Sequence, residues 1–403
     1  MKTIKEQHKS IATIVAYAIA PLSGIAVDLY SPSLPAMARD LNVSVLQIQF
    51  SVSIYLIAYG LSQLFVGTLL DSFGRFKLSQ IALLIFSITC FGIAIFPNIQ
   101  LIYFFRIIQG ISIGFVLVSK RAYLVDVFEG EKLKHALSLF TVIWAIGPII
   151  APFIGGNIQN YLGWEYNFYF LGLTSLLGVI LDFIYGGETL RSPNKFNFNH
   201  ILGSYTKMLG SADFLLGIVL CSLSYSIILI FTLTSPFLIE HTMHFSSLTT
   251  GYALLVIGVS MLTGNLLGKL LIRYNFMKTG FIANVIQLAI ILSMFFVFRF
   301  WPNLYTLVGL TSIVTMMSAF VFNNYFTYCL RKFPEAAGIA GGLTGGLMYI
   351  FVSGITYLLV RFIPVTVLTN LATYDLILAG SISIALISFV RMQNKRVLVG
   401  KTA

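Results

Sequence analysis

The sequence predicts an all-α membrane protein with twelve transmembrane helices in two six-helix halves. Hydrophobic residues make up 58% of the 403 residues and charged residues only 10%, whereas a soluble domain has about 25% charged residues. The apolar residues form long runs without alternating polarity, and the positive charges gather on every second connecting segment. Because backbone polar groups cannot stay unpaired in lipid, unbroken apolar runs predict helices rather than barrel strands.

About twelve runs reach the roughly 20 residues that a helix needs to cross the hydrocarbon layer. The first follows three lysines, as a signal peptide does, but it continues into Asp28 and two prolines instead of a cleavage site, so we expect it to remain as a span. The spans are expected at residues 11–32, 47–69, 78–96, 100–122, 136–158, 165–186, 213–238, 249–271, 280–299, 303–328, 338–361 and 371–391.

The positive charges predict the orientation of these spans. If the N-terminus is cytoplasmic, only Arg39, Arg299 and Arg361 lie outside and Arg106 lies within a span, and every other Lys and Arg is at a cytoplasmic segment. This bias predicts that both termini are cytoplasmic. The net charge of +11 is therefore explained by orientation in the bilayer, and we expect no nucleic-acid partner.

The sequence offers no enzyme motif. It contains no phosphate-binding loop, no cluster of His or Cys ligands and no serine-nucleophile motif, so we expect no enzyme activity, no cofactor and no metal site. Cys90, Cys221 and Cys329 fall within apolar spans and are expected to be buried thiols. If the protein is not a transporter, the alternatives from another functional class are a membrane enzyme or a receptor that resembles a transporter but moves no solute.

A polar stretch divides the chain into two halves. Residues 187–212 form the longest polar segment and fall between the sixth and seventh spans. The sequence therefore predicts an N-terminal six-helix bundle at residues 1–186, a central cytoplasmic loop at 187–212 and a C-terminal six-helix bundle at 213–403. Transporters built from two such repeats bind their substrate near the middle of the membrane.

Two charged residues lie within the predicted spans. Asp28 is near the outer end of the first span and Arg106 near the outer start of the fourth, so both belong to the outer half of the membrane. A charge at this depth costs on the order of 3 kcal/mol and usually faces a partner or a water-filled cavity. We interpret Asp28 as a proton acceptor and Arg106 as the cation that tunes it. Asp182, Glu240 and Asp375 are expected at solvated span ends.

A charged loop after the second span carries a family resemblance. It reads Gly67-Thr-Leu-Leu-Asp71-Ser-Phe-Gly74-Arg75-Phe-Lys77 and resembles the Gly-x-x-x-Asp-x-x-Gly-Arg-x-Lys loop of the major facilitator superfamily. The resemblance implies the two-bundle fold of that superfamily and a gating role for the loop, in which Asp71 and Arg75 stabilise the outward-open state.

Two further motifs resemble the same superfamily. Arg106-Ile-Ile-Gln109-Gly110 is similar to its Arg-x-x-Gln-Gly motif, whose arginine is associated with proton coupling. The segment from Gly147 to Gly156 resembles the antiporter motif Gly-Pro-x-x-Gly-Pro-x-x-Gly-Gly, with alanine at the second glycine, and it is associated with export. Its glycines allow close packing, for example against the eighth span, and its prolines allow bending. The expected gating residues of this segment are Gly147, Pro148, Pro152, Gly155 and Gly156.

The drug/proton antiporters of the Bcr/CflA and MdfA type are the subgroup that the chain resembles most. The first span ends in Asp28-Leu-Tyr30-Ser-Pro32-Ser-Leu-Pro35, and the seventh contains Ser235-Pro236-Phe237. The MdfA type has a second acid two turns before the aspartate, where this chain has Ala20. That departure argues against a coupling scheme with two acids in the first span.

The predicted function is a proton-coupled efflux transporter for amphipathic small organic molecules, drug-like compounds or a secreted metabolite, working by alternating access. A proton-coupled symporter that imports a small solute or siderophore is the alternative within the same fold. The resemblance implies a monomer in the bacterial inner membrane. The residues expected to line a substrate cavity are polar or aromatic side chains of central spans: Tyr30, Tyr59, Gln63, Ser235, Asn265, Asn323 and Tyr325.

Overall fold

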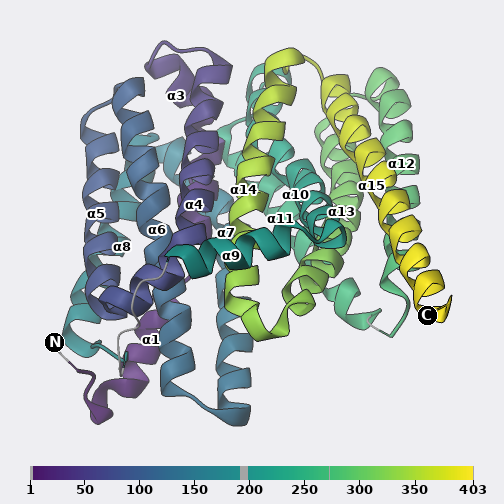
Figure 1. Ribbon diagram of the computed structural model, residues 1–403. Helices are drawn as coiled ribbons and strands as arrows, with labels where there is room; N and C mark the ends of the chain where they lie inside the picture. Colours follow the sequence, from purple (N-terminus) through teal and green to yellow (C-terminus); the bar gives the residue numbers. More distant parts are fainter. Residues whose placement is uncertain (1–2, 191–197, 272, 403) are drawn as a thin grey trace. The chain divides into compact units, whose positions relative to one another are not determined.

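A computed structural model shows that the described chain, residues 3–190, 198–271 and 273–402, is built from helices (Figure 1). Twelve helical segments of this part are long and apolar enough to cross a membrane, which confirms the predicted fold class. The chain divides into two compact units, Met1–Phe198 and Asn199–Ala403. The division falls within the polar stretch between the sixth and seventh spans.

The N-terminal unit contains the first six spans. Its helices are η1 (Glu6–His8), α1 (Lys9–Ile19), α2 (Leu22–Asp28), η2 (Ser31–Ser33), α3 (Leu34–Asp40), α4 (Val45–Phe73), α5 (Arg75–Ile95), α6 (Ile99–Val127), α7 (Gly130–Tyr161) and α8 (Glu165–Tyr185). Within the unit, α4 (the second span) packs against α6 (the fourth). α5 (the third span) packs against α6 and α8 (the sixth), and α2, in the first span, packs against α7 (the fifth).

The first span is a broken helix that runs from Glu6 to Asp40. It is interrupted after α1, where Pro21 lacks an N–H to donate, and again after α2, where Pro32 lies in the short 3₁₀ turn Ser31–Ser33. Asp28 is the last residue of α2. The breaks therefore place the only acid of the middle of this span at a point where the helix can bend.

Polar side chains fix the starts of several spans. Ser44 and Gln47 form a reciprocal capping box at the start of α4, and Asn98 accepts from the first backbone N–H groups of α6. Gly74 ends α4 with φ = 97°, a backbone conformation that favours glycine. The turn between α4 and α5 therefore requires this glycine of the charged loop.

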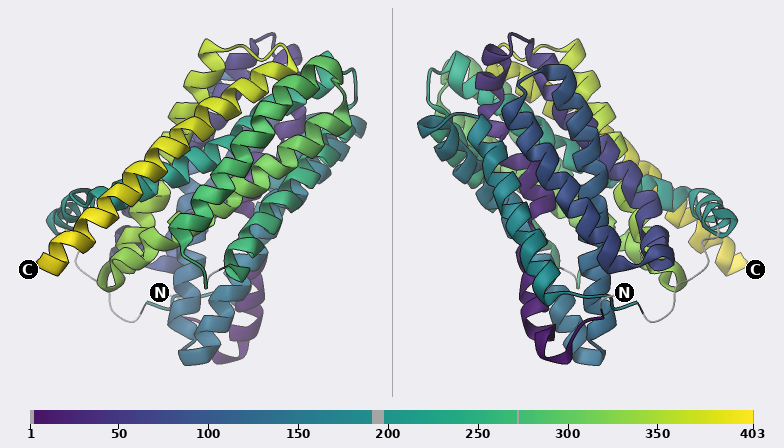
Figure 2. Two further views of the ribbon diagram at one scale, coloured as in Figure 1. Left: turned by 90° about the vertical axis from the view of Figure 1, so that its right-hand side faces the viewer. Right: turned by 90° about the vertical axis from the view of Figure 1, so that its left-hand side faces the viewer.

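The C-terminal unit contains the other six spans. α10 packs against α13, α14 and α15, and α12 packs against α13 and α15; Figure 2 shows α15 in yellow running beside the green α12. The helices are α9 (Phe198–Leu209), α10 (Ala212–Phe237), η3 (Leu238–Thr242), α11 (Ser247–Leu270), α12 (Phe276–Phe300), α13 (Leu304–Lys332), η4 (Pro334–Ala336), α14 (Ala337–Phe362) and α15 (Leu368–Thr402).

The polar stretch at 187–212 contains a helix that the sequence reading treated as loop. α9 places apolar residues every three positions, at Leu202, Tyr205 and Met208, which is close to the spacing of one helical face. Met208 is buried, whereas Leu202 is exposed. The segment is too short and too polar to span a bilayer, and its amphipathic pattern is that of a helix lying at a surface.

Candidate functional site

Arg106 lies inside the N-terminal unit. It comes from α6, one turn before Gln109, and its side chain is fully buried. Its Nη1 donates hydrogen bonds to the carbonyl of Ala26 and to Oε1 of Gln109, both at 3.0 Å. Gln109 in turn donates to Sγ of Cys90 at 3.3 Å. These bonds join α2, α5 and α6 around one cation.

Three aromatic rings surround the guanidinium of Arg106. Its Cζ lies 4.0 Å from the ring centroid of Tyr30, 5.0 Å from that of Phe168 and 5.5 Å from that of Tyr55. A cation within about 6 Å of an aromatic face is attracted by the ring quadrupole. Nε and Nη2 of Arg106 have no hydrogen-bond partner among the described residues. The rings therefore supply much of the stabilisation that a carboxylate would otherwise give.

Asp28 does not pair with Arg106 in this structure. Among the residues described, Asp28 forms neither an ion pair nor a hydrogen bond, and its side chain is partly exposed. Arg106 instead binds the backbone of Ala26, two residues earlier in α2. The two charges thus belong to one neighbourhood, but no salt bridge joins them.

The glycines of α7 pack directly on the broken first span. A Cβ added at Gly155 would lie 1.5 Å from the carbonyl oxygen of Leu29, and one added at Gly147 would lie 2.8 Å from Cβ of Pro21. A Cβ at Gly24 would meet Pro148 at 2.3 Å. The motif therefore fits α7 against both breaks of the first span. Sequence reasoning suggested the eighth span as a partner and did not identify this contact.

Gly110 of the Arg-x-x-Gln-Gly motif has the same kind of role. A Cβ at this position would come within 2.4 Å of the carbonyl oxygen of Tyr55 on α4. Tyr55 itself donates a hydrogen bond to the carbonyl of Ser23 at 3.2 Å. Close approach of α6 and α4 thus holds one ring of the Arg106 surroundings in place.

The charged loop forms an ion network at one end of the N-terminal unit. Oδ1 of Asp71 accepts from Nε and Nη2 of Arg75 at 3.1 and 2.7 Å, and Nη1 of Arg75 donates to Asp126 at 2.5 Å. This network brings together the second, third and fourth spans. Lys77 is exposed and has no ion pair among the described residues, and Gly67 has open space around it.

The segment that follows α8 closes over this network. Thr189 donates to Asp126 at 2.5 Å, and Glu188 accepts from the backbone N–H of Phe76 at 3.1 Å. Thr3 pairs with Glu188 through a parallel β-bridge. We call Gly186–Leu190 the strap. It is continuous with the sixth span and contacts the start of α5, so it joins the third, fourth and sixth spans and the segment before the first span at this end.

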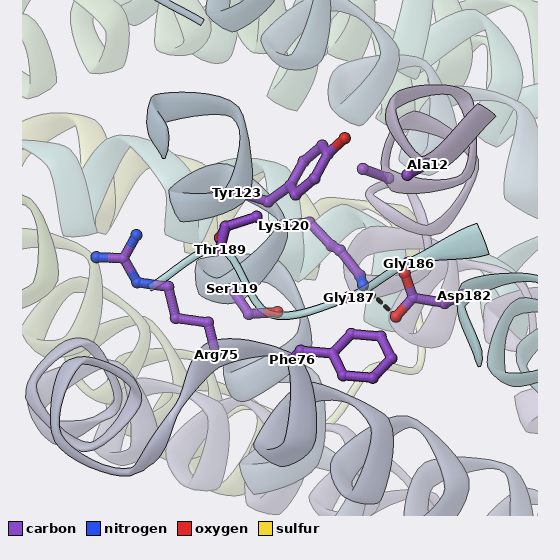
Figure 3. A pocket seen from close by; sticks show the side chains of 11 residues that line it. Ala12, Arg75, Phe76, Ser119, Lys120, Tyr123, Asp182, Gly186, Gly187 and Thr189 are labelled. Atoms are coloured by element: carbon purple, nitrogen blue, oxygen red, sulfur yellow. Dashed lines mark hydrogen bonds and ion pairs between the residues drawn. The ribbon is translucent and has the colours of Figure 1, made fainter. Parts of the chain in front are cut away.

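A small pocket lies beneath the strap (Figure 3). On one side of it Lys120 forms an ion pair with Asp182 at 2.5 Å, and Gln80 donates to the same carboxylate at 2.6 Å. Both members of the pair are about 5% exposed. The expectation that Asp182 is a solvated end residue is wrong, because its side chain is buried against Lys120 of the fourth span. The position of Asp182 near the end of its own span does not reveal this contact.

The remaining expected cavity residues are placed as follows. Tyr59 is buried and Gln63 half-buried on α4, Asn265 and Asn323 are half-buried on α11 and α13, and Ser235 is fully buried on α10. Tyr325 is fully buried between Phe276 and Phe389, with ring centroids 5.6 and 5.2 Å away. Tyr325 therefore occupies a packing position inside the C-terminal unit.

Sequence reasoning missed Tyr55 and Phe168 because neither belongs to a motif and aromatic residues are common throughout the chain. It also misplaced Asp375, which is 1% exposed and has two carboxylate oxygens without partners among the described residues. Asp375 lies only two turns into its span, and such a position ordinarily reaches water. The three cysteines are buried and free, as expected.

Two multidrug resistance proteins are similar to this chain over most of its length. The multidrug resistance protein MdtL of Vibrio parahaemolyticus is 28% identical over 94% of this chain and 95% of its own length. Multidrug resistance protein D of Escherichia coli is 25% identical over 90% and 91% of the two chains.

Solved transporters share the fold. The nucleoside transporter NupG superposes with a TM-score of 0.73 over 96% of this chain and 99% of its own, at 16% identity. A D-xylose-proton symporter superposes with a TM-score of 0.69 over 93% and 96%, also at 16% identity. The family model described as Major Facilitator Superfamily matches residues 16–356. This match covers most of the chain, and the protein therefore belongs to the major facilitator superfamily.

Proposed function

We propose that this membrane transporter is a proton-coupled exporter of amphipathic small organic molecules, working by alternating access between its two bundles. The relatives named as multidrug resistance proteins are 25–28% identical over nearly the whole chain, which supports export of this substrate class. The proposal includes a monomer in the bacterial inner membrane with both termini cytoplasmic, since the positive charges favour that orientation.

The contact between α7 and the end of α2 carries this proposal. Gly155 leaves no space between α7 and the carbonyl of Leu29, the residue after Asp28. A change at Asp28 that moves the end of α2 must therefore move α7, or be resisted by it, because packed helices do not deform continuously. The motif associated with export therefore packs directly on the end of α2 that carries the proposed proton acceptor, so that the two segments move together.

In the proposed cycle, Asp28 takes up a proton from the outside and releases it to the cytoplasm. Protonation favours loss of substrate to the outside, and deprotonation favours capture of substrate from the inside. Arg106 biases this exchange by its positive charge near the end of α2, where it already binds Ala26. One proton moving inward through 100 mV supplies about 2.3 kcal/mol.

Each bundle, taken by itself, has side chains that are proposed to contact substrate. Tyr59 and Gln63 belong to the N-terminal bundle, and Ser235, Asn265 and Asn323 belong to the C-terminal bundle. A site with aromatic walls and few polar groups suits amphipathic molecules, whereas a sugar needs more hydrogen-bonding groups. Tyr30 faces Arg106 and is assigned to the coupling site. Tyr325 is left out of the substrate site because it fills the packing between Phe276 and Phe389.

A growth-inhibition and accumulation panel tests the proposal. The gene is deleted and restored in its host, and cells are challenged with lipophilic cations, neutral drugs and their own secreted metabolites. We expect the deletion strain to accumulate at least one amphipathic compound and the restored strain to expel it. Restoration with D28N is expected to leave the compound inside. Reduced accumulation in the deletion strain, reversed by the wild-type gene, would instead identify an importer.

A further inference from the structure

A second carboxyl is enclosed in the C-terminal unit without any partner. Asp375 lies two turns into α15, its side chain is 1% exposed, and neither carboxylate oxygen has a hydrogen-bond partner among the described residues. This burial is by the atoms of the protein. Its neighbours along the same helical face, Leu371, Leu378 and Ala379, are buried and apolar.

The other enclosed acids of the described chain show what this protein does with a carboxylate. Asp182 pairs with Lys120 and accepts from Gln80. Asp213 pairs with Lys332 at 2.5 Å and accepts from Tyr328 at 2.6 Å. Glu188 accepts three backbone N–H groups, those of residues 76, 189 and 190. Each buried acid except Asp375 therefore has the donors that an ionised carboxylate requires.

Among the described residues, the charged groups of α10 and α12, the helices packed most extensively against α15, lie far from Asp375. α10 carries one charge, Asp213, which contacts Gln393, and Gln393 is about 27 Å along α15 from Asp375 at 1.5 Å per residue. Cys221 of α10 lies against the carbonyl of Phe322 on α13. Tyr225 of α10 packs against aromatic rings of α13 and α14.

The charges of α12 and α13 lie at the ends of those helices. Lys278 and Arg299 are exposed at the two ends of α12. Asn284 of α12 donates a hydrogen bond to the carbonyl of Ala379, which fixes the position of α12 along α15. This register puts Arg299 roughly 16 Å from Asp375 along the helix axis. Tyr328 on α13 contacts Phe389, about 21 Å along α15, and Lys332 lies one turn further from Asp375.

We propose that Asp375 is a second proton-binding residue of this transporter, and that it holds its proton inside the C-terminal bundle while Asp28 serves the N-terminal bundle. A carboxyl without cation or donor at this depth is stable only as the neutral acid. Proton binding converts one carboxylate and one proton to that acid, and no other reactant is needed. The coupling part of this assignment rests on the proposed proton-driven function.

Infrared spectroscopy of the purified full-length protein tests the protonation directly, without substrate. Exposed acids are ionised at neutral pH, so the C=O band of protonated carboxyl groups comes from enclosed acids. We expect this band in D28N, where Asp375 is the remaining candidate, and its loss in D28N/D375N. E131Q is the matched control, because Glu131 is exposed and paired with Lys134, and it should leave the band unchanged.

Absence of the band in D28N overturns the assignment, and this result does not require D375N to fold. Retention of the band in a folded D28N/D375N also overturns it. Proteoliposomes then test coupling with ethidium as the probe, where D375N should move fewer protons per ethidium than wild type. An unchanged ratio contradicts a coupling role. If wild-type protein shows no proton-driven flux, the proposed function is wrong. The infrared experiment still decides whether Asp375 holds a proton, because it does not depend on transport.

Discussion

Arg106 shows how a fully buried cation is accommodated without a carboxylate. Two hydrogen bonds from one nitrogen and three aromatic rings replace the usual ion pair. A planar guanidinium can stack on rings and donate at its edge at the same time, whereas an ammonium is a compact and strongly hydrated charge. The site is therefore built for arginine in particular.

R106K is predicted to lose proton-driven transport while the protein remains folded. The ammonium keeps the charge, but it cannot both reach Ala26 and cover the ring of Tyr30, so we expect destabilisation of about 2 kcal/mol from the lost desolvated cation–π contact. Thermal unfolding in detergent and flux in proteoliposomes measure the two effects. R39K, at an exposed side chain, should match wild type in both. Full flux in R106K would refute the proposed role.

The sequence identifies the charged members of this site but not their surroundings. Arg106 and Gln109 stand out because polar residues in an apolar span are rare, and Asp28 stands out for the same reason. Phe168 and Tyr55 cannot be found this way, since nothing in their spacing separates them from the rest of the 35 Phe and 20 Tyr residues of the chain. The burial of Asp182 and Asp375 cannot be predicted from their positions along the chain, because it depends on the neighbouring spans.

At the scale of elements, α7 and the broken first span act as a fitted pair. Pro21 and Pro32 fix where the first span bends, and Gly147 and Gly155 fix where α7 can touch it. The sequence contains these prolines and glycines and predicts that they lie in helices. It could not predict the partner, because a small-residue face is compatible with any helix that approaches it.

G155A is predicted to destabilise the protein and to abolish transport. The added methyl group would lie 1.5 Å from the Leu29 carbonyl oxygen, so one backbone must move, at a cost of about 1–3 kcal/mol. G309A is the control, because no atom lies within 4 Å of its added methyl group and the residue is within α13. A lower melting temperature is expected for G155A alone, and equal melting and flux in both variants would contradict the fitted pair.

The strap is the second element with a measurable role. T189V removes the hydrogen bond to Asp126 but leaves the bond from Arg75, and a hydrogen bond to a charged group contributes about 1.5–3 kcal/mol. We expect the strap to open more often, so that S119C in the pocket beneath it reacts faster with a maleimide in the solubilised protein. T174V is the control, since Thr174 bonds only within its own helix. Equal labelling rates in the two variants would exclude a closing role.

At the scale of the whole molecule, the chain consists of two compact helical units. Among the described residues, the N-terminal unit has Asp28, which is partly exposed and forms no ion pair or hydrogen bond, and the C-terminal unit encloses Asp375 without a partner. The twelve spans follow from hydropathy alone because a bilayer requires continuous apolar helices. The proposed role of Asp375 does not follow from hydropathy, because what distinguishes this residue is the absence of a described partner in three dimensions.

The direction of flow in proteoliposomes tests the central claim, that proton entry drives substrate exit. Protein is reconstituted with ethidium as the probe, and a proton gradient is imposed across the membrane. We predict that ethidium moves against the direction of the protons and that D28N, at unchanged melting temperature, shows no gradient-driven movement. Movement of ethidium in the same direction as the protons, or full gradient-driven movement in D28N, would contradict the account.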